Sequence, residues 1–325
     1  MPQSSVPPSW ELIVVDDASG DDTAMVARRF ADHVITLPGP GAAGPAAARN
    51  AGAAVARGEI LVFVDADVRV RPDAVARLVG ALTEDPTLGA AFGSYDATPA
   101  RHSVCSRYRN LLHHYVHQHG AGLAETFWAG CGAVRRDAFL EAGGFDARRY
   151  RRPQIEDIAL GYRMRDLGHR IRLVPEAQGT HLKAWTLTGI LRTDVVDRGI
   201  PWMRLLLERG RPHTPPHLNV SPAAAGQAVA VCLAGLGLGA GLVGGPAPLP
   251  AVSALLLVAV IGGNRHFYRW LAARHGWGFA LRCIPLHLAH HGLNGVSAAL
   301  GSLAYLLTTL RTACVRRSVA TEGRP

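Results

Sequence analysis

The stretch ILVFVDADV, residues 60–68, decides the fold class of this chain. Its first five residues form an uninterrupted apolar run, which is typical of a buried strand when polar residues bound it. Because side chains alternate along a strand, we expect Asp65 and Asp67 on the same side of the sheet edge, where open α/β sheets bind ligands. Two carboxylates there suit Mg2+ or Mn2+ shared with a diphosphate. The D-x-D pattern alone is common and also fits an acid-rich turn, so its weight comes from the buried strand before it.

Working outward from this strand, short apolar runs alternate with helical patterns over the first 210 residues. The expected strands are residues 11–15, 34–37, 60–64 and 89–92, and the expected helices are residues 22–31, 45–57 and 72–82. This rhythm of strand, helix and strand predicts an α/β domain with a parallel sheet covered by helices.

A second buried strand precedes Asp16 and Asp17 in the run WELIVVDDASGDDT, residues 10–23. We expect it to neighbour the D-x-D strand, where an acid at its tip accepts a hydrogen bond from the base or ribose of a nucleotide. Asp21 and Asp22 also fit a turn and a helix cap. On the helix that leads into the D-x-D strand, Arg49 and Asn50 face either the nucleotide or solvent, and both readings remain open.

The composition limits the class of protein without choosing its partner. Charged residues make up 18% of the 325 residues, apolar residues 48%, and the net charge is +9. These values argue against a disordered chain and indicate membrane segments. The five cysteines are scattered without a C-x-x-C pair, so neither a disulfide framework nor a zinc site is predicted.

The C-terminal third has a different composition. Residues 211–222, RPHTPPHLNVSP, are rich in proline and predict a linker between a domain of residues 1–210 and a membrane domain of residues 223–325. Residues 223–245, 249–263 and 293–310 are uncharged and approach the length of a membrane-crossing helix. We therefore expect two or three membrane helices, the alternative being a buried helical hairpin. Arginine clusters on either side of the third segment conflict with three crossings, so one segment is expected to lie in the interface.

Five motifs in order resemble those of a family 2 glycosyltransferase with the nucleotide-sugar-binding GT-A fold. They are VVDDASGDDT, AARNAGAAVARGEILVFVDADV, TFWAGCGAVRRDAF, GGFD and EDIALGYRMRDLG, and the resemblance covers roughly residues 10–207. Each motif is weak alone, but the order is specific to the family.

The resemblance implies roles for individual residues. Asp17, with Asp16 before it, matches the acid that contacts the nucleoside, and Asp65 and Asp67 match the acids that bind the metal and the sugar nucleotide. Other matches come from later motifs: Glu156 and Asp157 match the paired acids, the second of which usually serves as general base, and His181 falls where some relatives place a further metal or diphosphate contact. A structural hydrogen-bonding role for His181 is the alternative.

The implied activity is transfer of a sugar from a nucleotide-diphosphate donor to a lipid-linked or saccharide acceptor at the membrane. Mg2+ or Mn2+ would offset charge on the leaving diphosphate, and a single base without a protein nucleophile implies inversion. The resemblance further implies a multi-pass membrane protein that contacts membrane lipids and has no nucleic-acid partner. Its catalytic domain is expected on the cytoplasmic side of a bacterial plasma membrane.

Trp128 in the third motif is a stacking surface for a sugar or a packed core residue. His113 and His117 have helical spacing that suits a polar helix near the acceptor better than a zinc site. Residues 187–207 mix apolar residues with arginines, as in a helix on the membrane surface or against a core.

The family's first strand is missing before Trp10, so we expect the upstream reading frame to encode it. Its absence motivates an alternative function, a catalytically inactive sugar-nucleotide-binding or scaffold protein. A membrane-bound nucleotidyltransferase is a third class, which would release pyrophosphate instead.

Overall fold

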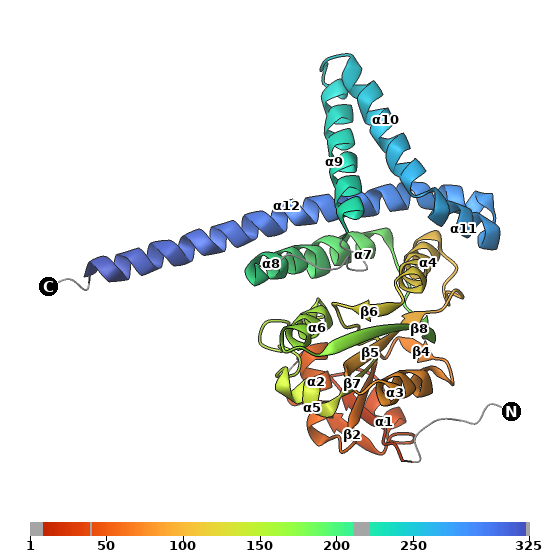
Figure 1. Ribbon diagram of the computed structural model, residues 1–325, viewed down its shortest axis with the longest axis vertical. Helices are drawn as coiled ribbons and strands as arrows, with labels where there is room; N and C mark the ends of the chain where they lie inside the picture. Colours follow the sequence, from red (N-terminus) through yellow and green to blue (C-terminus); the bar gives the residue numbers. More distant parts are fainter. Residues whose placement is uncertain (1–8, 40, 211–220, 323–325) are drawn as a thin grey trace. The chain divides into compact units, whose positions relative to one another are not determined.

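The computed structural model describes residues 9–39, 41–210 and 221–322 (Figure 1). The chain divides into two compact units, Met1–Trp185 and Thr186–Pro325, called here the N-terminal and C-terminal units. The predicted linker falls largely on residues 211–220, which lie outside the described residues. The predicted boundary at residue 210 differs from this division, because residues after Trp185 group with the C-terminal helices.

The N-terminal unit contains two sheets. The smaller pairs β1 (Ile13–Asp16) in parallel with β2 (His33–Thr36), with α1 (Thr23–Ala27) between them in sequence. The larger has the order β3-β7-β5-β8-β4, with β6 also paired to β8. Its strands are β3 (Ile60–Val64), β4 (Val68–Val70), β5 (Leu88–Tyr95), β6 (Gly122–Ala124), β7 (Cys131–Arg135) and β8 (Arg170–His181). The other helices of the unit are α2 (Pro45–Val55), α3 (Ala74–Glu84), α4 (Val104–His119), α5 (Arg136–Glu141) and α6 (Glu156–Asp166).

The α/β class is confirmed, but the prediction of a parallel sheet is wrong for the larger sheet. Among the described strands of that sheet, only β5 and β8 pair in parallel, while β7 lies antiparallel between β3 and β5. The expectation that β1 neighbours the D-x-D strand is also not met, because among the described residues β1 pairs with β2 alone. Hydrophobic periodicity identifies strands but carries no information on the direction of their partners.

Helix α3 covers one face of the larger sheet. Ala74, Leu78, Ala81 and Leu82 recur at helical spacing and are buried against a cluster that includes Cys131 and Ala133 of β7. This packing fixes β7, and with it the turn that precedes β7, against a rigid layer.

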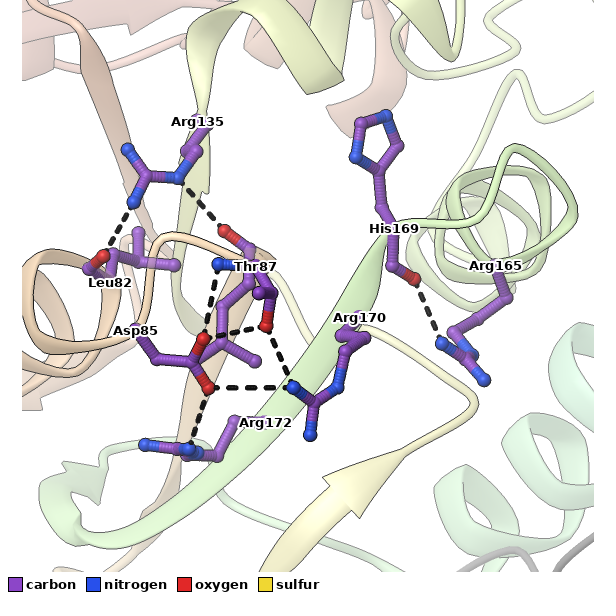
Figure 2. A network of polar contacts seen from close by, with 9 residues as sticks. Leu82, Asp85, Thr87, Arg135, Arg165, His169, Arg170 and Arg172 are labelled. Atoms are coloured by element: carbon purple, nitrogen blue, oxygen red, sulfur yellow. Dashed lines mark hydrogen bonds and ion pairs between the residues drawn. The ribbon is translucent and has the colours of Figure 1, made fainter.

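Polar contacts secure the connection from α3 to β5, as Figure 2 shows. Asp85 accepts hydrogen bonds from the Thr87 amide and hydroxyl and from Arg172 Nη2 at 3.1, 2.6 and 3.0 Å. Arg135 of β7 donates to the carbonyls of Leu82 and Leu88 at 2.5 and 2.9 Å. The end of α3 and strands β5, β7 and β8 are thereby tied together.

Every secondary-structure element in the described residues of the C-terminal unit is a helix. Its elements are α7 (Leu187–Arg192), the π-helix η1 (Thr193–Gly199), α8 (Ile200–Arg209), α9 (Pro222–Leu242), α10 (Pro248–Gly263), α11 (Arg265–His275) and α12 (Trp277–Glu322). The first three cover the segment 187–207 that was expected to be amphipathic. Ser221, the residue before α9, caps it by accepting the Ala224 amide at 3.1 Å.

Two helices of this unit are long and apolar enough to cross a membrane, namely α9 and residues 277–312 of α12. The pair α10 and α11 also qualifies as one bent segment, with a bend of 61° between the helices. The segments predicted at residues 249–263 and 293–310 lie in α10 and α12, and the segment predicted at residues 223–245 overlaps α9, which ends at Leu242.

Candidate functional site

The two aspartates of the D-x-D motif lie in a turn beyond β3. The Val68 amide donates to the Asp65 carbonyl at 2.9 Å and closes this turn. The expected strand alternation therefore does not apply, because β3 ends at Val64 and β4 begins at Val68. The two carboxylates instead have different partners, Arg49 for Asp65 and His181 for Asp67.

Arg49 joins two motifs that are far apart in the sequence. Its Nη2 donates to Asp65 at 2.5 Å, and its Nη1 donates to Glu156 at 2.9 Å. Burial opposes the charged form of Arg49, but the charges of Asp65, Glu156 and Asp157 outweigh it and raise the Arg49 pKa. The side chain is 15% exposed, so the solvent-facing alternative for Arg49 is wrong.

Asp67 faces His181 at the end of β8. In the β4–β8 register Val68 pairs with His181, which places the imidazole beside Asp67, with Nε2 3.4 Å from its Oδ2. The hydrogen bond with His181 lowers the pKa of Asp67 against the opposing effect of burial, and the charge of Lys183 adds to the lowering. Tyr95 stacks on the His181 ring with centroids 4.4 Å apart and planes 8° apart. No sequence motif indicated Tyr95.

The paired acids Glu156 and Asp157 form the first turn of α6, where both are buried. Glu156 accepts from Arg49 with one oxygen and from the Gln154 amide with the other, at 2.9 Å each. Asp157 accepts from the amides of Ile158 and Ala129 at 2.8 and 3.2 Å.

The loop before β7 connects these acids to the D-x-D turn. Ala129 donates its amide to Asp157, and the next carbonyl, of Gly130, accepts the Asp65 amide at 3.2 Å. A Cβ at Gly130 would lie 2.4 Å from the Trp128 ring, so this position requires glycine for the indole to fold over it. Trp128 also packs against Tyr95 and His113, which favours a packed over a freely exposed ring.

The residues predicted to contact the nucleotide hold backbone segments. Asp17 accepts the amides of Ala43 and Gly44 at 2.7 Å each, just before α2. Asp16 is buried and accepts the Ser19 amide at 3.2 Å. Asn50 donates to the Phe145 carbonyl at 2.7 Å and accepts the Phe145 amide at 2.9 Å, which fixes the GGFD motif to α2.

Two histidines of α4 contact backbone carbonyls of strand β5. His114 Nδ1 lies 2.8 Å from the Tyr95 carbonyl, and His117 Nδ1 lies 3.1 Å from the Gly93 carbonyl. His113 continues the ring stack from Tyr95, with centroids 4.3 Å apart. Within the described residues no three His, Cys, Asp or Glu side chains form a group that could hold a metal ion.

Cys131, at the start of β7, follows Gly130, whose carbonyl accepts the Asp65 amide. Burial raises the pKa of its thiol to about 12, with the charge of Asp65 adding to the rise. A thiol held in this way is not a nucleophile near neutral pH.

A known protein family matches the N-terminal part of the chain. Residues 4–143 match the family described as "Glycosyl transferase family 2". This segment is similar to a family 2 glycosyltransferase domain. It contains Asp17, Arg49, Asp65 and Asp67, whereas Glu156, Asp157 and His181 follow it in the chain.

Curated relatives share parts of the chain. The probable glycosyltransferase YdaM of Bacillus subtilis is 30% identical over 183 residues, 51% of this chain and 42% of that protein. The succinoglycan biosynthesis protein ExoO of Rhizobium meliloti is 39% identical over 70 residues, 21% of this chain and 20% of ExoO. The uncharacterized glycosyltransferase YibD of Escherichia coli is 33% identical over 88 residues, 26% of each chain. The chain thus spans less than half the length of these relatives.

Two solved structures are similar at lower levels. The mannosyltransferase PcManGT of Pyrobaculum calidifontis, in complex with GDP-Man and Mn2+, has a TM-score of 0.44 and 21% identity, covering 91% of this chain and 75% of that one. GalNAc-T7 with UDP, GalNAc and Mn2+ has a TM-score of 0.43 and 16% identity, covering 61% of this chain and 41% of that one.

Proposed function

We propose that this chain is an inverting glycosyltransferase, which moves a sugar from a nucleotide-diphosphate donor to a lipid-linked or membrane-proximal acceptor. The observation that carries the proposal is the convergence of acids from separate motifs within and just after the segment that is similar to a family 2 domain. Arg49 bridges Asp65 and Glu156, while the dipeptide Ala129–Gly130 bridges Asp157 and Asp65.

The leaving diphosphate requires positive charge. Asp67 and His181 supply two donors of types that Mn2+ or Mg2+ accepts, and Asp67 is ionised because its pKa is lowered. Since these described residues do not form a complete protein cage, diphosphate oxygens and water would complete the coordination, as Mg2+ sites on phosphates commonly do. The bound cation would stabilise the charge that develops on the departing diphosphate.

Asp157 is the proposed general base. Both Glu156 oxygens are engaged, one of them by the Arg49 guanidinium, so Glu156 fits a positioning role. The Asp157 carboxylate accepts the amides of Ile158 and Ala129, and these contacts fix its position at the first turn of α6, where it would take the proton of an acceptor hydroxyl. With Cys131 protonated, the base acts without a neighbouring thiol nucleophile, which supports direct displacement with inversion.

The nucleoside end of the donor is proposed to lie near Asp16 and Asp17, and the Asp17 contacts with Ala43 and Gly44 would shape the loop that borders it. The apolar helices of the C-terminal unit support an acceptor at the membrane. Because nucleotide sugars are made in the cytoplasm, we place the N-terminal unit on that side of a bacterial plasma membrane.

The test is release of a nucleoside diphosphate from a panel of sugar nucleotides, with the whole chain in detergent and Mg2+ or Mn2+ present. We expect release with at least one donor and its loss on chelation or in Asp67→Ala. Asp157→Asn should abolish turnover and retain donor binding, whereas Asp166→Asn, at the exposed end of the same helix, should change neither.

Other outcomes identify the alternatives. Donor binding by the unaltered chain without any turnover would indicate the binding or scaffold protein. Release of pyrophosphate would indicate a nucleotidyltransferase. Full activity in chelator and in Asp67→Ala would contradict the proposed metal role.

A further inference from the structure

Helices α9 and α10 form a tightly packed hairpin. A Cβ at Gly237 would lie 2.3 Å from Ser253 Oγ, and one at Gly241 would lie 2.7 Å from Pro250 Cγ. At the open end of the hairpin, a Cβ at Gly263 would lie 3.2 Å from Gln227 Nε2. The two helices therefore pack along their length, and the turn after Leu242 is the tip.

Helix α12 meets this hairpin near its open end. A Cβ at Gly295 would lie 2.5 Å from Cys232 Sγ, and one at Gly292 would lie 3.3 Å from Val231. Cys232 Sγ also donates to the Gly292 carbonyl at 3.6 Å. Figure 1 shows α12 running across the foot of the hairpin rather than alongside it.

One face of α12 is polar and covered by other helices of the unit. His287 and His291 are buried, and His287 Nδ1 lies 3.1 Å from the Tyr268 hydroxyl of α11. Ser297 donates to the Asp194 carbonyl of η1 at 3.3 Å, and His290 contacts the Asp194 carboxylate at 3.4 Å.

The opposite face of α12 is an apolar stripe at helical spacing. Its members are between 43% and 61% exposed: Val296, Leu300, Leu303, Leu307 and Leu310. Gly292 precedes Val296 by four residues and Leu303 by eleven, so it lies on the same face. The hairpin therefore projects from the same side of α12 as the leucine stripe.

From α9 to residue 321 the charged side chains are all basic. Between residues 209 and 321 the sequence contains no acidic residue. Arg265, Arg269 and Arg274 are exposed on α11, and Arg282 and Arg311 are exposed on α12. If α12 crossed a bilayer, Arg274 and Arg311 would lie on opposite sides, against the positive-inside rule, and Asp194, which contacts His290 and Ser297, would lie beside the crossing segment.

We propose that α12 lies flat in the membrane–water interface, with the leucine stripe against acyl chains, and that only the α9–α10 hairpin enters the hydrocarbon core. The lipid bilayer covers the leucine stripe, and the exposed arginines of α11 and α12 contact anionic lipid headgroups. Both ends of the hairpin then open to the same side, and every arginine cluster of the unit lies on that side. This arrangement satisfies the charge rule that three crossings violate.

The depth of three residues on each helix tests the proposal. Spin labels are placed at Val296, Leu303 and Leu310 of α12, and a matched series at Val229, Leu236 and Val243, along and just beyond α9. All six positions are exposed. The whole chain is reconstituted in phosphatidylcholine vesicles with phosphatidylglycerol, and depth is read from the accessibility of each label to oxygen and to a water-soluble nickel complex. Cys105, Cys232 and Cys314 are replaced by serine, whereas Cys131 and Cys283 are fully buried and remain.

A helix along the bilayer normal changes depth by about 20 Å over fourteen residues. We expect that gradient in the α9 series and a nearly constant depth of about 5–10 Å in the α12 series. A gradient of the α9 size along α12 would overturn the proposal. A flat α9 series would overturn it as well, because the hairpin would not be inserted. Nucleoside diphosphate release measured on the same vesicles reports the proposed activity separately.

Discussion

At the residue scale, the buried guanidinium of Arg49 connects Asp65 at the D-x-D turn with Glu156 at the start of α6. Arg49 lies 16 residues before Asp65 and 107 residues before Glu156, so the two carboxylates are 91 residues apart in the sequence. Removing the cation leaves the buried Glu156 and the partly exposed Asp65 without their shared partner, which is more costly than losing a surface ion pair.

We therefore expect Arg49→Ala to lower the free energy of unfolding of the N-terminal unit by about 3–5 kcal/mol. The matched control is Arg77→Ala, which removes an exposed ion pair with Asp73 of 2.7 Å within α3. That change should cost less than about 1 kcal/mol. Both are measured by denaturant unfolding in detergent. Equal effects of the two substitutions would contradict the bridging role.

Asp85 provides a prediction of pH dependence. Hydrogen bonds from Thr87, together with the charges of Arg170 and Arg172, hold the Asp85 pKa below its ordinary value of 3.8. A depressed pKa contributes stability that is present above the ordinary value and is lost as the pH falls through the lower, folded value. Asp85→Asn should therefore destabilise the chain at pH 6, and its difference from the unaltered chain should shrink below about pH 4.

Thr87→Val is the matched variant for this experiment, because the Thr87 hydroxyl is the largest cause of the lowering. It should move the acid end of the stability profile part of the way towards that of Asp85→Asn. Parallel profiles for all three proteins between pH 6 and pH 3 would show that Asp85 is not linked to folding.

The sequence motifs indicated which residues are candidates for the chemistry, but not which groups those residues contact. The motif order placed Asp67 and His181 in related roles, and the structure shows them 3.4 Å apart. The stacking of Tyr95 on His181 and the donation of the Ala129 amide to Asp157 had no signal in the sequence, because both depend on strands and loops brought together by tertiary packing. The positions of Asp65 and Asp67 were mispredicted for a local reason, since β3 ends one residue before the motif.

At the element scale, the position of α6 depends on a glycine. A Cβ at Gly161 would lie 2.3 Å from the Phe127 amide nitrogen, in the backbone that leads to Trp128 and Ala129. This close approach keeps the first turn of α6, with Asp157, next to the loop whose Ala129 amide it accepts.

Gly161→Ala should therefore destabilise the chain by about 1–3 kcal/mol through overpacking, and it should also lower turnover by shifting Asp157. Gly80→Ala in α3 is the control, because nothing lies within 4 Å of a built Cβ there. That substitution should stabilise by up to about 1 kcal/mol through helix propensity alone. Thermal unfolding and nucleoside diphosphate release give the two readouts, and a neutral Gly161→Ala would contradict the close packing.

The elements themselves show which properties the sequence encodes locally. Strands β1, β2 and β3 and helices α2 and α10 lie within a few residues of their predicted ranges, because periodicity and proline placement are local. Strand direction is not local: β7 inserts antiparallel between β3 and β5, so a rhythm that predicts parallel pairing gives a mixed sheet.

At the scale of the whole molecule, the two units differ in what covers their apolar surface. The N-terminal unit buries its apolar residues in a core between α3 and the larger sheet. In the C-terminal unit, Leu236 and Leu242 of α9 are 72% and 89% exposed. Such a surface is typical of contact with lipid rather than water.

Leu236→Arg tests this difference at the middle of α9. If α9 lies in a bilayer, the arginine should disfavour insertion by about 2.5–3.5 kcal/mol, and a larger share of the protein should be released from membranes by alkaline carbonate. Leu167→Arg is the matched control, because Leu167 is 46% exposed in the N-terminal unit and should tolerate the charge. The measurement is the fraction of each protein that stays in the membrane pellet after the wash. Because a water-exposed helix would tolerate both substitutions alike, equal pellet fractions for the two variants would remove the reason for placing α9 in the membrane.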